Sequence, residues 1–113
     1  MSRPLSHPHM SDVTVTNVLH ALADPTRLAI VSALLKAECG MNCTETTAKT
    51  KIDLPKSTCS QHYRILREAG IITSERKGVE LTSRVRRTEL DKYFPGLLDS
   101  ILSSYGKEKK RRA

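Results

Sequence analysis

Aromatic residues and long apolar runs are scarce in this sequence. It has no Trp, one Phe and three Tyr, so its core must be built from Leu, Ile, Val and Ala, which suits packed helices. No apolar run approaches the roughly 20 residues that a membrane span needs. Residues 1–10 lack the apolar segment of a secretory signal. We therefore expect a cytoplasmic protein with no membrane partner.

Cysteine and acidic residues are also few. Three cysteines are an odd number and cannot all pair within the chain, which, with the missing signal, indicates a reducing compartment. Asp and Glu number 12 against 19 Lys and Arg, and the net charge is +7. A basic excess on a small domain favours a polyanion, namely DNA, RNA or an anionic membrane surface. A basic surface that only aids solubility is the alternative.

Prolines and charge divide the 113 residues into three parts. Residues 1–10 contain Pro4 and Pro8 and are expected to form a flexible arm. Residues 11–105 carry helical and strand periodicity and are long enough for one modest core. Residues 106–113 form a basic run, for which we expect a disordered tail.

Capping signals place two helices at the start of the folded part. Ser11 or Asp12 can cap a first helix that reaches about Leu22. Asp24 is a strong N-cap, and the proline that follows it favours a helix over Pro25–Ala37. Both helices carry apolar residues at helical spacing.

Two further helices are expected in the middle of the chain. Asn42 and Glu45 have the spacing of a capping box, which begins a third helix. Pro55 begins a fourth, over about Lys56–Ala69, and Gly70 ends it. Together they predict two short helices joined by a tight turn.

A short hairpin and one more helix complete the domain. Segments 71–76 and 79–85 flank Lys77-Gly78 and predict the hairpin, with Val79 on the same face as later alternate residues. Thr88 is expected to cap a last helix that reaches about Tyr105. Pro95-Gly96 should break or restart this helix. Two helices and a hairpin in this order predict a winged helix-turn-helix.

One face of the fourth helix has the chemistry of a base-reading surface. Gln suits adenine, Arg suits guanine, and Ser and Thr suit bases or phosphates. The only acid on this helix, Glu68, lies at its far end. A solvated amphipathic helix is the alternative, although mixed charge is commoner on such a face. The polar residues of this face are Lys56, Ser57, Thr58, Ser60, Gln61 and Arg64.

Three stretches resemble the ArsR (SmtB-type) family of bacterial repressors. They are LHALADPTRLAIVSALL, DLPKSTCSQHYRILREAGIITSERKG and ELDKYFPGLLDSIL, and the resemblance covers Ala21 to Leu102. It implies a mostly α-helical winged helix-turn-helix with a small β-hairpin and about five helices. It further implies a homodimer built from the first and last helices, and operator binding that an inducer relieves.

The resemblance assigns roles by position. It places the recognition helix at 56–66 and the wing at Arg76-Lys77-Gly78 with its flanking strands. The residues expected at the DNA are Lys56, Ser57, Thr58, Ser60, Gln61, His62, Arg64, Arg76, Lys77 and Arg84. The residues expected at the dimer interface are Val15, Val18, Leu19, Leu97, Leu98, Ile101 and Leu102.

Several of these residues have a second interpretation. His62 matches the family's usual histidine, and it can read a base or pack against the protein. Cys59 stands where the family usually has Val or Ile, which favours a small buried side chain over a sensor thiol. Arg86 and Arg87 can contact phosphates, or they can pair with carboxylates nearby.

The metal sites of relatives are missing from this sequence. Thr44 and Thr46 stand where the arsenic-type site has a Cys-x-Cys pair, and no histidine follows His62 for the zinc-type site. We therefore expect no metal and no cofactor. Cys39 and Cys43 remain, with spacing C-x-x-x-C. They are either unreactive, or they respond to an oxidant or a soft metal or metalloid.

The sequence thus predicts a DNA-binding repressor without enzymatic activity. No Ser-His-Asp set, paired carboxylates or Gly-rich phosphate loop is evident. The alternative is a winged-helix interaction or RNA-binding module without a sensory role.

Overall fold

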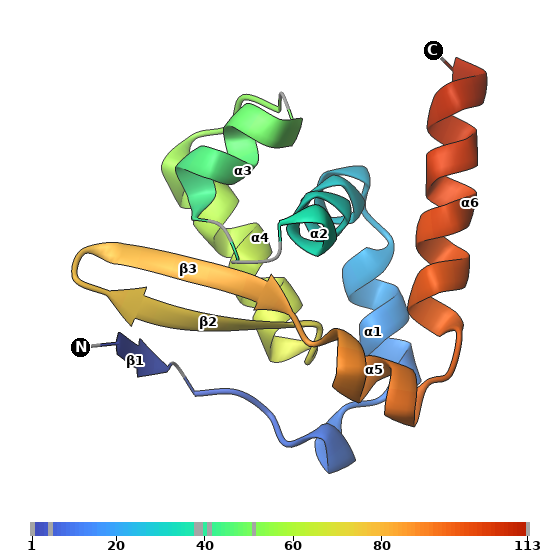
Figure 1. Cartoon of the computed structure of the whole chain (residues 1–113), viewed down its shortest axis with the longest axis horizontal. Helices are drawn as coiled ribbons and strands as arrows, with labels where there is room; N and C mark the ends of the chain where they lie inside the picture. The colour runs from blue at the N-terminus through green and yellow to red at the C-terminus, as the bar shows by residue number, and fades with distance from the viewer. Residues whose placement is uncertain (1, 5, 38–39, 41, 51, 113) are drawn as a thin grey trace.

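A computed structural model of the chain describes residues 2–4, 6–37, 40, 42–50 and 52–112. Its elements, in chain order, are β1 (Ser2–Pro4), a 3-10 turn η1 (Met10–Asp12), α1 (Val15–Leu22), α2 (Pro25–Lys36), α3 (Cys43–Thr50), α4 (Lys56–Glu68), β2 (Ile72–Lys77), β3 (Glu80–Val85), α5 (Arg87–Tyr93) and α6 (Leu97–Arg112). The hairpin of β2 and β3 extends from one side of the helical body, and α6 stands at the other (Figure 1). This confirms a mostly α-helical winged fold.

The helix starts with the strongest capping signals are confirmed. Asp24 Oδ1 accepts hydrogen bonds from the backbone N–H groups of Thr26 and Arg27, at 2.8 and 3.1 Å, with Pro25 beginning the helix. Asn42 and Glu45 exchange side-chain-to-backbone hydrogen bonds of 2.8 and 3.1 Å, as a capping box requires. These contacts satisfy amide groups that have no partner inside a helix.

Two other predicted starts were wrong. α1 is capped by Thr14, whose side chain accepts from the backbone N–H of Asn17, while Ser11 and Asp12 lie in the 3-10 turn that precedes it. Thr88 does not cap the last helical segment. It lies inside α5, which begins at Arg87 with Arg86 as its N-cap residue. Thr14 offers the same capping chemistry as Ser11 and Asp12, whereas the N-cap residue of α5, Arg86, makes no side-chain cap.

The expected break in the last helical segment is confirmed, but the two ends of the chain differ from expectation. α5 ends before Pro95, and α6 begins after Gly96. The basic tail continues α6 as helix to Arg112, since elongating an existing helix avoids the cost of nucleation. The arm contains β1, which pairs antiparallel with β2 and makes a three-stranded sheet of order β1-β2-β3.

The hairpin turns one residue later than predicted. Lys77 pairs with Glu80, so the turn is Gly78-Val79, and Gly78 has the positive φ of 62° that it needs. Val79 is 94% exposed and does not share the inner face of β3. On that face Ser83 is buried and lies opposite Ser74, with 2.7 Å between their hydroxyl oxygens.

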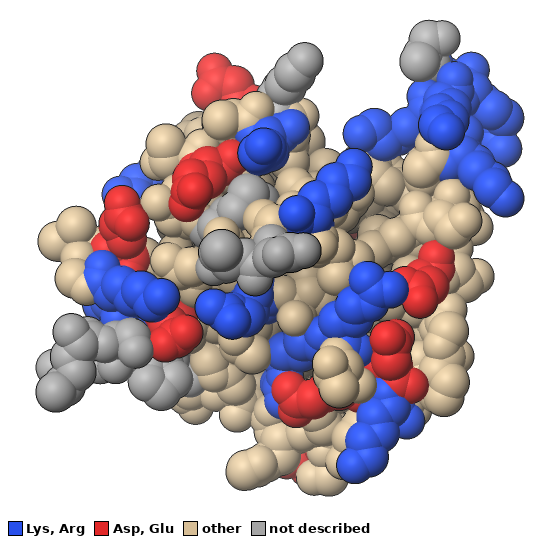
Figure 2. All heavy atoms as spheres, viewed as in Figure 1, with Lys and Arg blue, Asp and Glu red and all other residues tan. Residues whose placement is uncertain are grey.

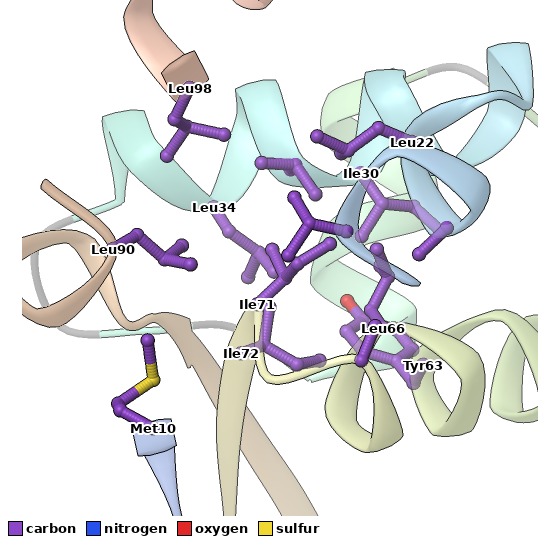
Figure 3. Close-up of a cluster of buried hydrophobic side chains, with 14 of the residues drawn as sticks. Met10, Leu22, Ile30, Leu34, Tyr63, Leu66, Ile71, Ile72, Leu90 and Leu98 are labelled. Carbon is purple, nitrogen blue, oxygen red and sulfur yellow. The ribbon is translucent and has the colours of Figure 1, made fainter. Parts of the chain in front are cut away.

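The core lies between α1, α2, α4 and β2, with single residues added from η1, α5 and α6 (Figure 3). Tyr63 and Leu66 from α4 meet Leu34 of α2 and the Ile71-Ile72 pair that leads into β2. Val18 of α1 and Leu98 of α6 belong to the same cluster. Within the described ranges, no single helix is long and apolar enough to cross a membrane. Only α1 and α2 together reach that length and composition, across a bend of 101°.

Candidate nucleic-acid interface

α4 separates its residues into a buried and an exposed face. Cys59, Tyr63 and Leu66 are buried at helical spacing, which confirms Cys59 as a small core side chain. Of the six polar residues predicted to form a base-reading face, five are exposed and Thr58 is half-buried. The exposed five are Lys56, Ser57, Ser60, Gln61 and Arg64.

A buried hydrogen bond fixes α4 against α3. The Tyr63 hydroxyl contacts Thr46 Oγ1, and Thr46 Oγ1 also donates to the backbone oxygen of Asn42 at 2.9 Å. Thr46 is 2% exposed. Tyr63 is also 2% exposed, so this contact links α3 to α4 inside the core, where a hydrogen bond is stronger than in water. The sequence analysis noted Thr46 only because it stands where relatives have a metal-binding cysteine, and it did not predict this contact with Tyr63.

Arg27 connects α1, α2 and α4, and sequence analysis missed it. Its Nε donates to the backbone oxygen of Ala21 at 2.5 Å, and its Nη1 lies 3.3 Å from Nδ1 of His62. Arginine can only donate, so Nδ1 of His62 accepts and Nε2 carries the ring proton. His62 is half-buried, and this contact favours its packing role over base reading.

The exposed face of α4 holds one ion pair. Arg64 Nε lies 3.7 Å from Glu68 Oε1, and both side chains are well exposed. An exposed i,i+4 pair contributes only about 0.3–0.5 kcal/mol, so Arg64 can leave Glu68 for a stronger partner at little cost. Arg67 is partly buried, and this burial lowers the pKa of its guanidinium.

The wing presents three exposed basic side chains. Arg76 and Lys77 lie at the end of β2, and Arg84 lies on β3 opposite Thr73. Lys77 stands opposite Glu80 across the hairpin, which reduces the net charge of the tip.

Arg86 and Arg87 are engaged in the body of the protein. Arg86 donates to both carboxylate oxygens of Glu89, at 3.2 and 2.9 Å, and to the backbone oxygen of Pro8 at 3.0 Å. The hydrogen bond from Arg86 lowers the pKa of Glu89. Arg87 pairs with Asp99 at 3.0 Å and with Asp91 at 3.8 Å. The pairing interpretation of both arginines is confirmed, and neither belongs to the wing surface.

The residues considered for metal or thiol chemistry are dispersed or lie outside the described part. Thr44 is exposed on α3 while Thr46 is buried. Cys39 and the side chain of Cys43 fall outside the described residues. Within those residues, no group of three or more His, Cys, Asp or Glu lies close enough to hold a metal ion.

Comparison with known proteins identifies relatives by sequence. A family model described as a helix-turn-helix domain matches residues 22–75. The uncharacterized HTH-type transcriptional regulator YceK of Bacillus subtilis is 31% identical over 84 residues, which are 74% of this chain and 82% of that protein. The HTH-type transcriptional repressor SmtB of Mycobacterium tuberculosis is 37% identical over 68 residues, or 60% of this chain. This chain spans only 47% of that repressor.

A solved structure agrees with the sequence relatives. An ArsR-like transcriptional regulator from Rhodococcus sp. RHA1 matches with a TM-score of 0.56 at 27% identity, covering 86% of this chain and 83% of that one. Family and fold are those of DNA-binding regulators and not of enzymes. The resemblance noted in the sequence is therefore confirmed, and the chain belongs to the ArsR/SmtB family of winged helix-turn-helix transcriptional regulators.

Proposed function

We propose that the protein is a homodimeric repressor that binds a double-stranded operator through α4 and is released from it by an inducer. The observation that carries this proposal is the exposed face of α4, where five polar or basic residues face solvent while the opposite face is anchored in the core. A helix held this way can enter a major groove without rearranging.

Three of the α4 residues are suited to base edges and two to positioning. Gln61 and Arg64 can each form paired hydrogen bonds, with adenine and guanine respectively, and Ser60 can contact either bases or phosphates. Lys56 and Ser57 lie in the first turn of α4, near a helix N-terminus that favours phosphate. Thr58 and His62 are half-buried, so we assign them to packing rather than to base reading.

The wing completes this proposed interface. Arg76, Lys77 and Arg84 are exposed and supply charge for phosphates beside the groove. Such contacts position a protein on DNA without reading its sequence.

The proposed dimer interface is smaller than the sequence predicted. Val18 and Leu98 are 2% and 3% exposed, so they belong to the protomer's own core and offer no surface to a partner. Val15 and Leu19, one turn apart on α1, are 43% and 46% exposed. We propose that they join the half-buried Leu97, Ile101 and Leu102 of α6 in a two-fold contact.

The first experiment measures binding and assembly together. Fluorescence anisotropy with duplex DNA from upstream of the protein's own gene should show saturable binding that exceeds binding to random duplex.

Sedimentation at micromolar concentration should show a dimer that Leu19→Glu converts to monomer, with Val79→Glu as an exposed control. A monomeric wild type would refute the dimer, and equal binding to both duplexes would refute operator recognition.

An RNA-binding or interaction module without a sensory role is the second candidate. It shares the basic surface, and competition by structured RNA against the duplex separates the two. RNA that displaces operator DNA at equal concentration would favour this alternative.

The inducer is proposed from sequence alone to be an oxidant or a soft metal or metalloid that reacts with Cys39 and Cys43. Gel shifts of the wild type and of the Cys39→Ser/Cys43→Ser variant test it. Release of the wild type alone by peroxide, As(III), Cd(II) or Zn(II) would support a thiol response. Retention in every case would refute it.

A further inference from the structure

A cleft separates the C-terminal half of α6 from α2 and α3. Its volume is about 600 Å³, which lies within the roughly 300–1,000 Å³ typical of sites for small molecules. Figure 2 shows this hollow between the upper part of α6 and the rest of the molecule, with Lys or Arg side chains on both of its sides. The cleft lies outside the proposed DNA interface, since no residue of α4 or of the wing lines it.

The floor of the cleft is mainly apolar. Ala29 and Ala33 of α2, Ala37 directly after it and Ile52 line the floor, together with the hydroxyl groups of Ser32 and Thr50. Small side chains leave room above the helix, and the resulting surface gains stability when a hydrocarbon covers it.

The rim of the cleft is cationic. Lys36, Lys49 and Lys109 line it from three different helices. Among the described residues, none of these three ammonium groups is within ion-pair distance of a carboxylate, although Arg27, Arg64, Arg86 and Arg87 all have such partners. No described acidic residue lines the cleft.

Tyr105 adds a hydroxyl to the cationic rim. Its side chain lines the cleft, and Nζ of Lys109 lies 5.5 Å from the centre of its ring. Burial, reinforced by Glu108, raises the pKa of the Tyr105 hydroxyl. At neutral pH the phenol therefore keeps its proton and can donate a hydrogen bond to an anion.

We infer that this cleft binds a small organic anion whose apolar body covers the alanines of α2 and whose carboxylate lies among Lys36, Lys49, Lys109 and Tyr105. Charge of one sign around an apolar floor selects this class of ligand, because a neutral or cationic molecule leaves the ammonium groups uncompensated.

The test uses probes that share a body and differ in the head group. Octanoate, 1-octanol and octylamine are titrated into the full-length protein and followed by calorimetry, with acetate as a head group without a body. Octanoate should bind most tightly, octylamine most weakly, and acetate not measurably. Methyl resonances of Ala29 and Ala33 should shift with octanoate. Equal binding of the three eight-carbon probes would overturn the inference, as would absence of octanoate binding.

Variants then locate the bound anion. Lys36→Gln/Lys49→Gln/Lys109→Gln should weaken octanoate binding by about tenfold, as expected for three exposed charge pairs. Ala33→Leu should weaken all three eight-carbon probes by filling the floor. Lys92→Gln is the matched control, because Lys92 also lies over a tyrosine, 5.9 Å from the ring centre of Tyr93, but outside the cleft. Equal octanoate affinity in the triple variant and the control would overturn the site.

The cleft also offers a route to regulation, an extension that rests on the proposed function. α3 contacts α4 through Thr46 and Tyr63, so an anion that bridges α3 and α6 would bias the placement of α4. Saturating octanoate should change operator affinity by about 5-fold or more, and operator should change octanoate affinity by the same factor. Absence of DNA binding without octanoate would contradict the proposed function. Unchanged DNA affinity with octanoate bound would contradict only the coupling.

Discussion

α4 and α6 differ in how one protomer uses their apolar residues. α4 has 13 residues and buries Cys59, Tyr63 and Leu66, whereas α6 has 16 residues and buries only Leu98. α4 also receives polar contacts from Thr46 and from Arg27. The helix proposed to present a surface to DNA is thus fixed within its own chain, while α6 leaves half-buried apolar residues for other contacts.

The largest expected effect comes from shortening a core residue of α4. Leu66 is fully buried, so Leu66→Ala should lower the free energy of unfolding by about 2–5 kcal/mol. Leu102→Ala in α6 is the matched variant, and because Leu102 is only half-buried its loss should be clearly smaller. Urea unfolding at one fixed protein concentration measures both. Equal losses would contradict the distinction between the helices.

Glycines at the two helices should respond in opposite directions. Gly70 follows α4 with φ of +84°, and a Cβ there would collide with Cγ2 of Val13. Gly70→Ala should therefore cost about 2–3 kcal/mol of unfolding free energy. Gly106, inside α6, has nothing within 4 Å of such a Cβ, so Gly106→Ala should gain about 0.5–1 kcal/mol. Thermal unfolding of both variants is the check, and a stabilised Gly70→Ala would be the contrary result.

Changes on the exposed face of α4 should affect DNA affinity rather than folding. Gln61→Ala or Arg64→Ala should weaken operator binding by about 1–3 kcal/mol and leave non-specific binding nearly unchanged. Lys77→Ala in the wing should instead weaken binding to every duplex and lower the salt dependence. Anisotropy titrations on operator and random DNA at several salt concentrations separate the two. Equal losses on both duplexes for all three variants would contradict this division of roles.

The smallest effect is a pH dependence at α5, the helix that precedes α6 in the chain. Arg86 lowers the pKa of Glu89, so this carboxylate stabilises the folded state above its unfolded pKa of roughly 4.3. That contribution is lost as the pH falls through the lower folded value. The Glu89 side chain is 49% exposed, and solvent screening keeps the effect small. Between pH 7 and pH 3, the free energy of unfolding should decrease less steeply for Glu89→Gln than for the wild type. If the stability curves of the two proteins against pH are superimposable, the Arg86–Glu89 pair contributes nothing to the free energy of unfolding.

Local chemistry was sufficient to predict most of the elements. Asp24-Pro25, the Asn42 and Glu45 capping box, the amphipathic α4 and the break at Pro95 each follow from residues within one or two turns. The residues exposed on α4 follow from the same periodicity, which is why the candidate interface was largely predictable.

Contacts between distant residues were not predictable. Arg27 meets His62 35 positions away, and β1 pairs with a strand more than seventy residues later. No local pattern marks either contact, and β1 contains a proline that argues against a strand. Val18 and Leu98 carry the same apolar signal as Leu19 and Leu97, so only packing separates core from surface.

The pairing of β1 with β2 protects the wing from other chains. An unpaired strand edge offers backbone N–H and C=O groups to any extended peptide, and this is a common start of aggregation. In this protein Ser2–Pro4 occupy one edge of β2, and Ser74 N–H next to them donates to Nε2 of His7 at 2.9 Å. A chain shortened to begin at Ser11 would lose both the pairing of β1 with β2 and the hydrogen bond to His7. It would expose β2 to strand exchange and lower the solubility of the protein at high concentration.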